Sequence, residues 1–331
     1  MQYSSCIALL RDDSRFRGVR VLDTLRSAFL GTNKALSLHK SVRLSEPCIS
    51  SGVRELERLC PSDPKDEESP IFLLSAGWRS GSTLLQRMVM SNPRTMIWGE
   101  PYNECGLIQA LATSVKAFRG GWPSNNFIFD GSALEKLNHQ WIANLFPKPA
   151  DWRLAHRSLF DKLLEQPARD SGATRWGIKE VRLSAEHCLY LRWLYPRAKF
   201  VFLTRHPLDA YLSYSRYGRH WYFTFPDEPV LTPVQFGHRW RQLAEGFLNT
   251  ASELSALVVR YEDLITSDLT VQCIEQYLSI EIDPAVLSCK VGSSRRIGDA
   301  HVSRLERALL RRAVSPVAAS LGYSWESRLQ G

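Results

Sequence analysis

Short apolar runs alternate with longer amphipathic segments along the chain from residue 71 onward. A short unbroken apolar run is typical of a strand buried on both faces, and apolar residues three and four positions apart are typical of a helix. The runs predict strands at 71–75, 96–98, 175–178, 199–204 and 256–260. The amphipathic segments predict helices at 82–91, 184–194, 207–217, 232–254 and 269–279. Strands that alternate with helices predict a parallel sheet covered on both faces, with ligands at the carboxyl ends of the strands.

The same pattern divides the chain into segments of different character. Residues 1–69 have mixed polarity and end in a run of Pro, Ser, Asp, Lys and Glu, so we interpret them as an N-terminal extension and charged linker. Residues 70–331 form the predicted domain. Within it, residues 102–173 break the strand pattern and are rich in Trp, Asn and Phe, which predicts a helical insertion.

The loop after the first predicted strand has the composition of an anion site. It runs from Gly77 to Thr83 as GWRSGST and opens directly into a predicted helix. Its glycines let the backbone approach a ligand closely, Arg79 offers a planar cation, and a helix N-terminus attracts negative charge. A nucleotide-kinase loop, G-x-x-x-x-G-K-[ST], carries a Lys for the phosphates and a hydroxyl for Mg²⁺. Here the second Gly comes one residue early and no Lys follows it. The loop therefore predicts phosphate binding without the magnesium apparatus.

A second strand–loop–helix element offers another phosphate site. Arg205 follows the strand predicted at 199–204, and Pro207 suits the first turn of the next helix, where a missing N–H costs nothing. Ser213 comes eight residues after Arg205, about two helical turns along. His206, between them, could act as a base, although a histidine before proline at such a turn is more often structural.

These two elements, in this order, resemble the sulfotransferase family that uses 3′-phosphoadenosine-5′-phosphosulfate (PAPS), over roughly residues 70–294. In that family an R-S-G-[ST]-T loop, here Arg79-Ser80-Gly81-Ser82-Thr83-Leu84, binds the 5′-phosphosulfate. A later Arg–Ser pair, here Arg205 and Ser213, binds the 3′-phosphate. The resemblance implies a three-layer P-loop-like α/β fold with a central parallel β-sheet flanked by helices.

The motifs are most similar to the branch that contains the protein-tyrosine sulfotransferases. That branch carries a Gly-Glu whose carboxylate is the catalytic base, which matches Glu100, and a Lys near the bridging oxygen, which matches Lys179. We expect Arg79 and Lys179 to stabilise the negative charge that grows on the bridging oxygen. Lys179 could instead be a strand-end lysine paired with Glu180. The chain departs from the branch at Pro101-Tyr102, which leaves the acceptor open.

The resemblance also implies roles for further residues. Tyr261, in a Tyr-Glu-Asp-Leu turn, is expected to contact the adenosine. Ser293, Ser294 and Arg295 lie in a basic loop where the family closes over the 3′-phosphate or the sulfuryl group. The insertion at 102–173 is expected to cover the acceptor, although a packed helical subdomain is an equal alternative.

Composition narrows the partners. Lys and Arg exceed Asp and Glu by 42 to 34, which suits an anionic co-substrate. Neither a basic-aromatic module nor zinc-ligand spacing is present, so we expect no nucleic-acid partner and no metal. The seven cysteines are scattered, odd in number and without C-x-x-C, which favours a reducing compartment, and we predict a cytoplasmic protein. No apolar run is long enough to predict a membrane anchor. For the oligomeric state, a homodimer is left as an open alternative.

The sequence therefore predicts a sulfotransferase that moves a sulfuryl group from PAPS to an acceptor hydroxyl of a carbohydrate, phenol or natural product. A nucleotide or small-molecule kinase is the first alternative, and the missing P-loop Lys argues against it. A non-catalytic nucleotide-binding protein is the second, and Glu100 and Lys179 argue against that.

Overall fold

The computed structural model describes residues 48–61, 67–100, 106–132, 134–139, 141–216, 230–288 and 302–325, all within the compact unit Pro47–Gly331. The predictions for Ser293, Ser294 and Arg295, and the departure at Pro101-Tyr102, lie outside these residues.

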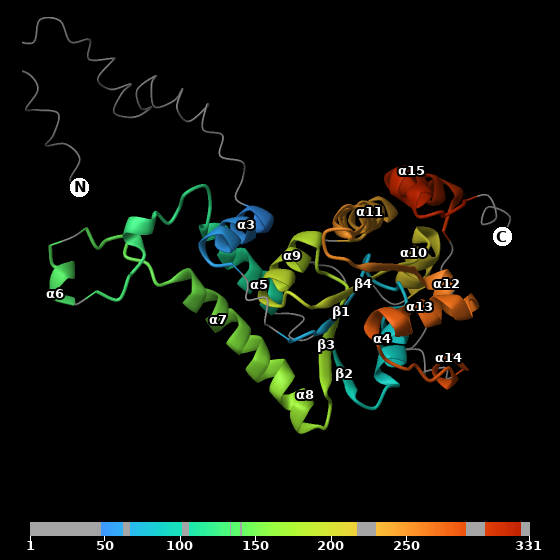
Figure 1. Ribbon diagram of the computed structural model, residues 1–331. Helices are drawn as coiled ribbons and strands as arrows, with labels where there is room; N and C mark the ends of the chain where they lie inside the picture. The colour runs from blue at the N-terminus through green and yellow to red at the C-terminus, as the bar shows by residue number, and fades with distance from the viewer. Residues whose placement is uncertain are drawn as a thin grey trace, which may run out of the picture. The chain divides into compact units, whose positions relative to one another are not determined.

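The centre of the fold is a five-stranded sheet in which every pairing is parallel. Its strands are β1 (Ile71–Ser75), β2 (Thr95–Gly99), β3 (Arg175–Glu180), β4 (Lys199–Thr204) and β5 (Leu257–Arg260). The order β2-β3-β1-β4-β5 places β1, which precedes the glycine loop, between β3 and β4. All the predicted strands are present, and Figure 1 shows them running side by side through the middle of the molecule.

Helices cover both faces of the sheet. The described helices of eight or more residues are α3 (Ile49–Leu59), α4 (Ser82–Met90), α5 (Leu107–Ser114), α7 (Pro149–Phe160), α9 (Ala185–Leu194), α10 (Pro207–Arg216), α11 (Pro233–Thr250), α13 (Asp268–Leu278) and α15 (Arg304–Ser320). The shorter ones are α6 (Leu134–Leu137), α8 (Gln166–Asp170), α12 (Tyr261–Thr266) and α14 (Ala285–Ser288). Among the described helices, none combines the length and the hydropathy that crossing a bilayer requires.

The two faces of β1 bury their side chains in different cores, because successive residues of a strand point to opposite sides. Phe72 and Leu74 join a large core with side chains of α3, α5, α9, α10, α11 and α15. Ile71 and Leu73 join a smaller core with side chains of α4, α12 and α13. This layering confirms the three-layer α/β prediction.

Helix α3 lies before residue 70, where we predicted the domain to begin, and yet it packs into the large core. Its buried residues include Ile49, Val53 and Leu56. Its N-terminus is capped from far along the chain, because the Ile49 N–H and the Ser50 hydroxyl both donate to the Glu186 carboxylate at 3.0 Å. The compact unit therefore starts upstream of the charged linker.

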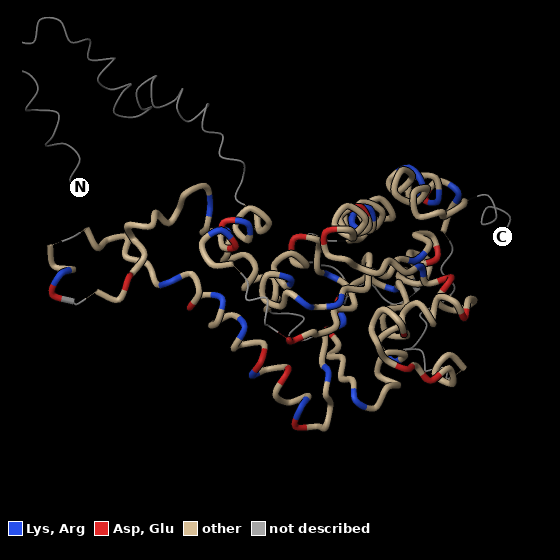
Figure 2. Tube along the Cα trace, in the orientation of Figure 1, with Lys and Arg blue, Asp and Glu red and all other residues tan. Residues whose placement is uncertain are grey.

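The predicted insertion at 102–173 contains α5, α6, α7, α8 and a π-helical turn at Asp161–Glu165. Its second half is packed, since Phe160, Leu164 and Ala168 belong to the large core. Acidic and basic residues are interspersed along α7, the π-helical turn and α8 (Figure 2), and an Arg169–Glu165 pair at 2.6 Å joins α8 to that turn. By contrast, Trp141 is 72% exposed. The segment thus contains helices in its described residues, and its prediction as an acceptor-covering insertion stays a prediction.

Candidate active site

The loop between β1 and α4 has an unusual backbone. Gly77 and Gly81 have φ of 85° and 91°, and Arg79 between them has φ of 61°. A left-handed conformation costs a non-glycine residue roughly 1–2 kcal/mol, and such strain is concentrated at functional sites. The Ser80 hydroxyl donates to the Gly77 carbonyl at 3.1 Å, which ties the turn to itself. Gly81 then caps α4, so that the first N–H groups of this helix face the loop.

The ring of Tyr261 packs directly on this loop. A Cβ added to Gly81 would lie 2.1 Å from Cδ2 of Tyr261, so no larger residue fits there. The guanidinium of Arg205 lies on the same ring, 4.5 Å from its centroid. Tyr261 therefore joins the two predicted phosphate elements, which come from loops more than a hundred residues apart in the sequence.

Arg79, Arg205 and Ser213 are in direct contact. Nη1 of Arg205 donates to the Arg79 carbonyl at 2.8 Å, and Nε of Arg79 donates to the Ser213 hydroxyl at 3.0 Å. Nε of Arg205 is buried and has no hydrogen-bond partner in the described part of the chain. A buried N–H normally finds a partner, because leaving it unpaired costs roughly 1–3 kcal/mol. A phosphate oxygen would satisfy this atom, so the residues present fit the predicted nucleotide.

Glu100 and Lys179 form the other half of the site. The Glu100 N–H donates to the Lys179 carbonyl at 2.8 Å, which extends the hydrogen-bond ladder between β2 and β3 by one residue. The left-handed φ of 45° at Glu100 then ends the extended backbone of β2. The ammonium of Lys179 pairs with the Glu100 carboxylate. Lys179 is 6% exposed, whereas the Glu100 side chain is 24% exposed. The ammonium pairs with Glu100, and no bond to the neighbouring Glu180 is present among the described residues.

Glu180 has a separate role at the end of β3. Its carboxylate accepts the N–H groups of Val181 and Arg182 at 3.1 Å and pairs with the Arg182 guanidinium at 3.4 Å. Burial raises the pKa of Glu180 to about 7; Arg182 opposes this shift and the charge of Glu100 adds to it. Glu180 therefore closes the turn after Lys179.

Two further residues show how the site is supported. Gln86, which the sequence analysis did not single out, donates its amide N–H from α4 to the Ile97 carbonyl of β2 at 2.8 Å. A polar residue one turn inside the helix of an anion loop is the signal that could have revealed it. His206 is structural, because Nδ1 accepts the Leu208 N–H at 3.3 Å and Nε2 lies 3.1 Å from the Ser324 carbonyl.

The remaining predicted loop residues line the start of α4. Ser80 and Ser82 are buried and Thr83 is exposed. Leu84 is half-buried and packs against the smaller core, so its side chain serves the fold, while its N–H bonds to the Gly81 carbonyl at 2.9 Å. The structure thus brings together the loop, Arg205, Ser213 and Tyr261, and separately joins Glu100 to Lys179 at the ends of β2 and β3.

The carboxyl edge of this parallel α/β sheet thus carries a glycine loop, two arginines and a Lys–Glu pair. The sulfotransferase family model matches residues 70–284, which is more than half of the chain, and the chain belongs to this family. No curated protein matches the chain.

The chain is similar to several solved structures. The sulfotransferase domain of the Synechococcus PCC 7002 olefin synthase is 17% identical, with 79% of this chain and 98% of that chain covered and a TM-score of 0.43. The sulfotransferase domain of the curacin biosynthetic pathway is 18% identical, and the match covers 78% of this chain and 98% of that chain with a TM-score of 0.43. Sulfotransferase STF1 of Mycobacterium tuberculosis H37Rv is 14% identical, and the match covers 80% of this chain and 81% of that chain with a TM-score of 0.39.

Proposed function

We propose that this sulfotransferase takes its sulfuryl group from PAPS and passes it to an acceptor hydroxyl, with Glu100 as the general base. The unpartnered Nε of Arg205, beside the glycine loop, is the observation that carries the donor assignment. In this proposal the loop from Arg79 to Leu84 and the N-terminus of α4 bind the 5′-phosphosulfate. Arg205 and Ser213 bind the 3′-phosphate, and Tyr261 lines the nucleotide site.

The chemistry follows from the charges in the site. The acceptor oxygen attacks sulfur, the bond from sulfur to the bridging oxygen breaks, and the electron pair stays on the 5′-phosphate. Arg79 and Lys179 stabilise that growing charge, which lowers the barrier because the interaction strengthens in the transition state. The acceptor proton passes to the Glu100 carboxylate, which the Lys179 ammonium holds in place.

The acceptor class is proposed from the reaction and from the family. A carboxylate base suits a hydroxyl, whether of a carbohydrate, a phenol or a natural product. Ser293, Ser294 and Arg295 belong to this proposal as residues that close over the nucleotide.

The base is tested with Glu100→Gln, which keeps the size of the side chain and removes its charge. Release of 3′-phosphoadenosine-5′-phosphate (PAP) from PAPS is followed in the presence of carbohydrate and phenol acceptors. We expect turnover to fall by about 10²–10⁴-fold, while PAP affinity changes little. Glu135→Gln, at an exposed position of α6, is the matched control and should turn over as the wild type does. Equal turnover in wild type and Glu100→Gln would exclude Glu100 as the base.

A further inference from the structure

The two residues that flank Arg205 are held by a segment far along the chain. This segment, 323–325, has the sequence Tyr-Ser-Trp and follows α15. The Tyr323 hydroxyl lies 2.8 Å from the hydroxyl of Thr204, and both side chains are buried. Segment 323–325 therefore contacts the residue before Arg205, at the end of β4.

The other neighbour of the arginine, His206, is bound to the same segment. Nδ1 of its imidazole accepts the Leu208 N–H at 3.3 Å, so in the neutral ring the proton lies on Nε2. Nε2 therefore donates to the Ser324 carbonyl, 3.1 Å away. The imidazole also packs edge-on against the rings of Tyr323 and Trp325, with centroids 5.5 and 5.1 Å apart. His206 is buried, so these contacts are largely shielded from water.

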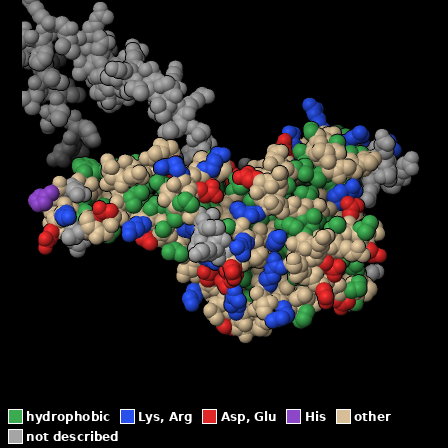
Figure 3. Space-filling view, viewed as in Figure 1, with side chains coloured by type: hydrophobic (Ala, Val, Ile, Leu, Met, Phe, Trp, Pro, Cys, Tyr) green, Lys and Arg blue, Asp and Glu red, His purple; other side chains and the backbone are tan. Residues whose placement is uncertain are grey.

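Helix α15 fixes the place of segment 323–325. Its buried face packs on α11, where a Cβ added to Gly237 would lie 2.9 Å from the Ala313 side chain. Its outer face carries basic side chains, seen at the upper right of Figure 3. From α11 the Trp240 indole N–H donates to the Arg205 carbonyl at 3.1 Å, and its ring lies 6.2 Å from that of Tyr323. The two helices and the segment thus support the same stretch of backbone.

The first turn of α12 holds this stretch as well. The Glu262 carboxylate accepts the His206 N–H at 2.9 Å, next to Tyr261, whose ring carries the Arg205 guanidinium. An arginine recognises a phosphate through N–H groups in a fixed fork, and such a fork is precise only when the backbone behind it is fixed. Contacts on both sides of Arg205 supply that fixed backbone.

We propose that Tyr323 and Ser324 are positioning residues for the 3′-phosphate, which act on Arg205 through Thr204 and His206. This inference rests on the proposed function, because it requires that Arg205 bind the 3′-phosphate. Segment 323–325 then sets the preference for a nucleotide that carries a 3′-phosphate over one that lacks it. Binding of the 5′-phosphate depends on the glycine loop and does not need the segment.

The test compares PAP with adenosine 5′-phosphate (AMP), which differs from PAP only in lacking the 3′-phosphate. Two substitutions separate the bond to Ser324 from the cap that His206 provides to α10. His206→Asn keeps an oxygen for the Leu208 N–H, as a good N-cap residue does, but is too short to reach Ser324. His206→Gln places an amide N–H near the position of Nε2 and gives up the cap.

Calorimetric titration measures the affinity of each variant for both nucleotides. We expect His206→Asn to lose about fivefold in PAP affinity, the equivalent of one hydrogen bond, with AMP affinity unchanged. His206→Gln should bind both nucleotides as the wild type does. Tyr323→Phe, a milder variant that removes only the hydroxyl facing Thr204, should also lower the preference for PAP.

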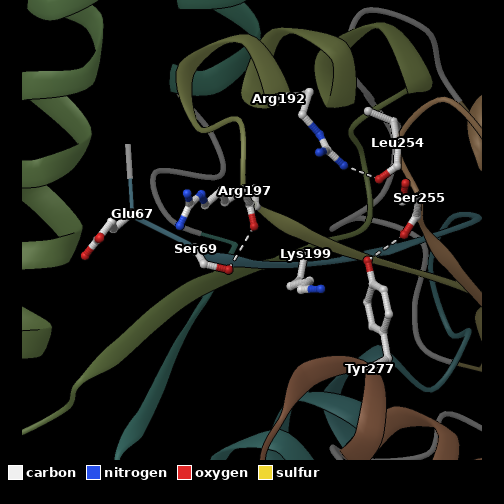
Figure 4. A pocket seen from close by; sticks show the side chains of 9 residues that line it. Glu67, Ser69, Arg192, Arg197, Lys199, Leu254, Ser255 and Tyr277 are labelled. Carbon is white, nitrogen blue, oxygen red and sulfur yellow. Dashed lines mark hydrogen bonds between the residues drawn. The ribbon is translucent and has the colours of Figure 1, made fainter. Parts of the chain in front are cut away.

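Tyr277→Phe is the matched control. The Tyr277 hydroxyl donates to the Ser255 carbonyl at 2.9 Å (Figure 4) and accepts the Phe200 N–H at 3.1 Å, near the amino end of β4. The substitution therefore removes a hydrogen-bonded tyrosine hydroxyl at the opposite end of that strand from Arg205. It should leave the preference for PAP over AMP unchanged.

The proposal is overturned if His206→Asn and Tyr323→Phe keep the wild-type preference, or if they weaken both nucleotides equally, as a general loss of structure would. Loss of the preference in His206→Gln but not in His206→Asn would assign the effect to the helix cap and would also overturn it. A wild type that binds PAP no better than AMP would contradict the assignment of Arg205 to the 3′-phosphate, and this inference with it.

Discussion

At the scale of single residues, the loop geometry depends on the absence of a side chain at Gly81. The Tyr261 ring occupies the space that a Cβ would need, and the Arg205 guanidinium rests on the same ring. A change at one backbone position therefore reaches both predicted phosphate elements. Arg79 also has a left-handed backbone, with φ of 61°, and its carbonyl and guanidinium bond to Arg205 and Ser213.

We predict that Gly81→Ala weakens PAP binding at least tenfold, because the added methyl group displaces Tyr261 from the loop. Gly172→Ala is the matched control, since Gly172 has the same φ of 91° but no atom within 4 Å of an added Cβ. It should cost about 1 kcal/mol of stability through backbone strain and leave PAP affinity unchanged. Equal affinity in the two variants would show that contact with Tyr261 does not shape the site.

The sequence predicted the residues of this site better than their contacts. Composition and spacing indicated Arg79, Arg205 and Ser213 as candidates, and the family resemblance implied Glu100 and Lys179. The pairing of Lys179 with Glu100 rather than Glu180 could not be predicted, because it depends on the register of β2 against β3. The contact between Tyr261 and Gly81 likewise depends on how two loops meet.

At the scale of elements, the proposed base Glu100 lies at the end of an edge strand. Among the described strands β2 pairs with β3 alone, and side chains of neighbouring elements also support it. The amide of Gln86 holds it from α4, and the Trp98 indole N–H donates to the Leu164 carbonyl in the π-helical turn at 2.9 Å. Gln86 thus links the helix of the phosphate loop to the strand of Glu100.

We predict that Gln86→Ala lowers kcat by about tenfold while PAP affinity stays within threefold, because one charge-neutral hydrogen bond of about 1 kcal/mol is lost. Gln86→Glu keeps the size of the side chain but places an oxygen against the Ile97 carbonyl, so it should lose at least as much. Steady-state turnover and PAP titration measure the two effects separately. A parallel loss of PAP affinity would mean that Gln86 supports the loop and not the base strand.

Periodicity predicted the five strands and the helices α4, α9, α10, α11 and α13, because local sequence determines them. Where the secondary structure predicted from the sequence was incomplete, the reason was a contact between residues far apart in the chain. β3 continues to Glu180 rather than stopping at 178, since Lys179 and Glu180 are charged residues that the fold buries at the site. Helix α3 was not predicted, because the residue that caps it, Glu186, lies far along the chain.

At the scale of the whole molecule, the compact unit begins at Pro47, and α3 is part of its core. A chain that begins at Pro47 should therefore unfold at the same temperature as the full chain. A chain that begins at Glu67 exposes the surface that Ile49, Val53 and Leu56 cover. At about 1.5–3 kcal/mol for each buried side chain, the loss approaches the total stability of a domain.

Calorimetric or spectroscopic unfolding of the two truncated chains checks this prediction. We expect the transition of the shorter chain to fall by more than 10 °C or to vanish. Leu56→Ala in the longer chain should cost about 2–5 kcal/mol by leaving a cavity. A shorter chain as stable as the longer one would place the start of the domain at residue 70 after all.

The proposed function requires that the glycine loop and Arg205 together bind a 3′-phosphorylated adenine nucleotide. Calorimetric titration of PAP tests it most directly, with wild type, Arg205→Ala, the exposed control Arg311→Ala, and ATP-Mg²⁺ as a competing ligand. We predict tight binding of PAP by wild type and Arg311→Ala, at least a hundredfold loss in Arg205→Ala, and little response to ATP-Mg²⁺. A preference for ATP-Mg²⁺, or PAP binding that Arg205→Ala leaves intact, would contradict the account.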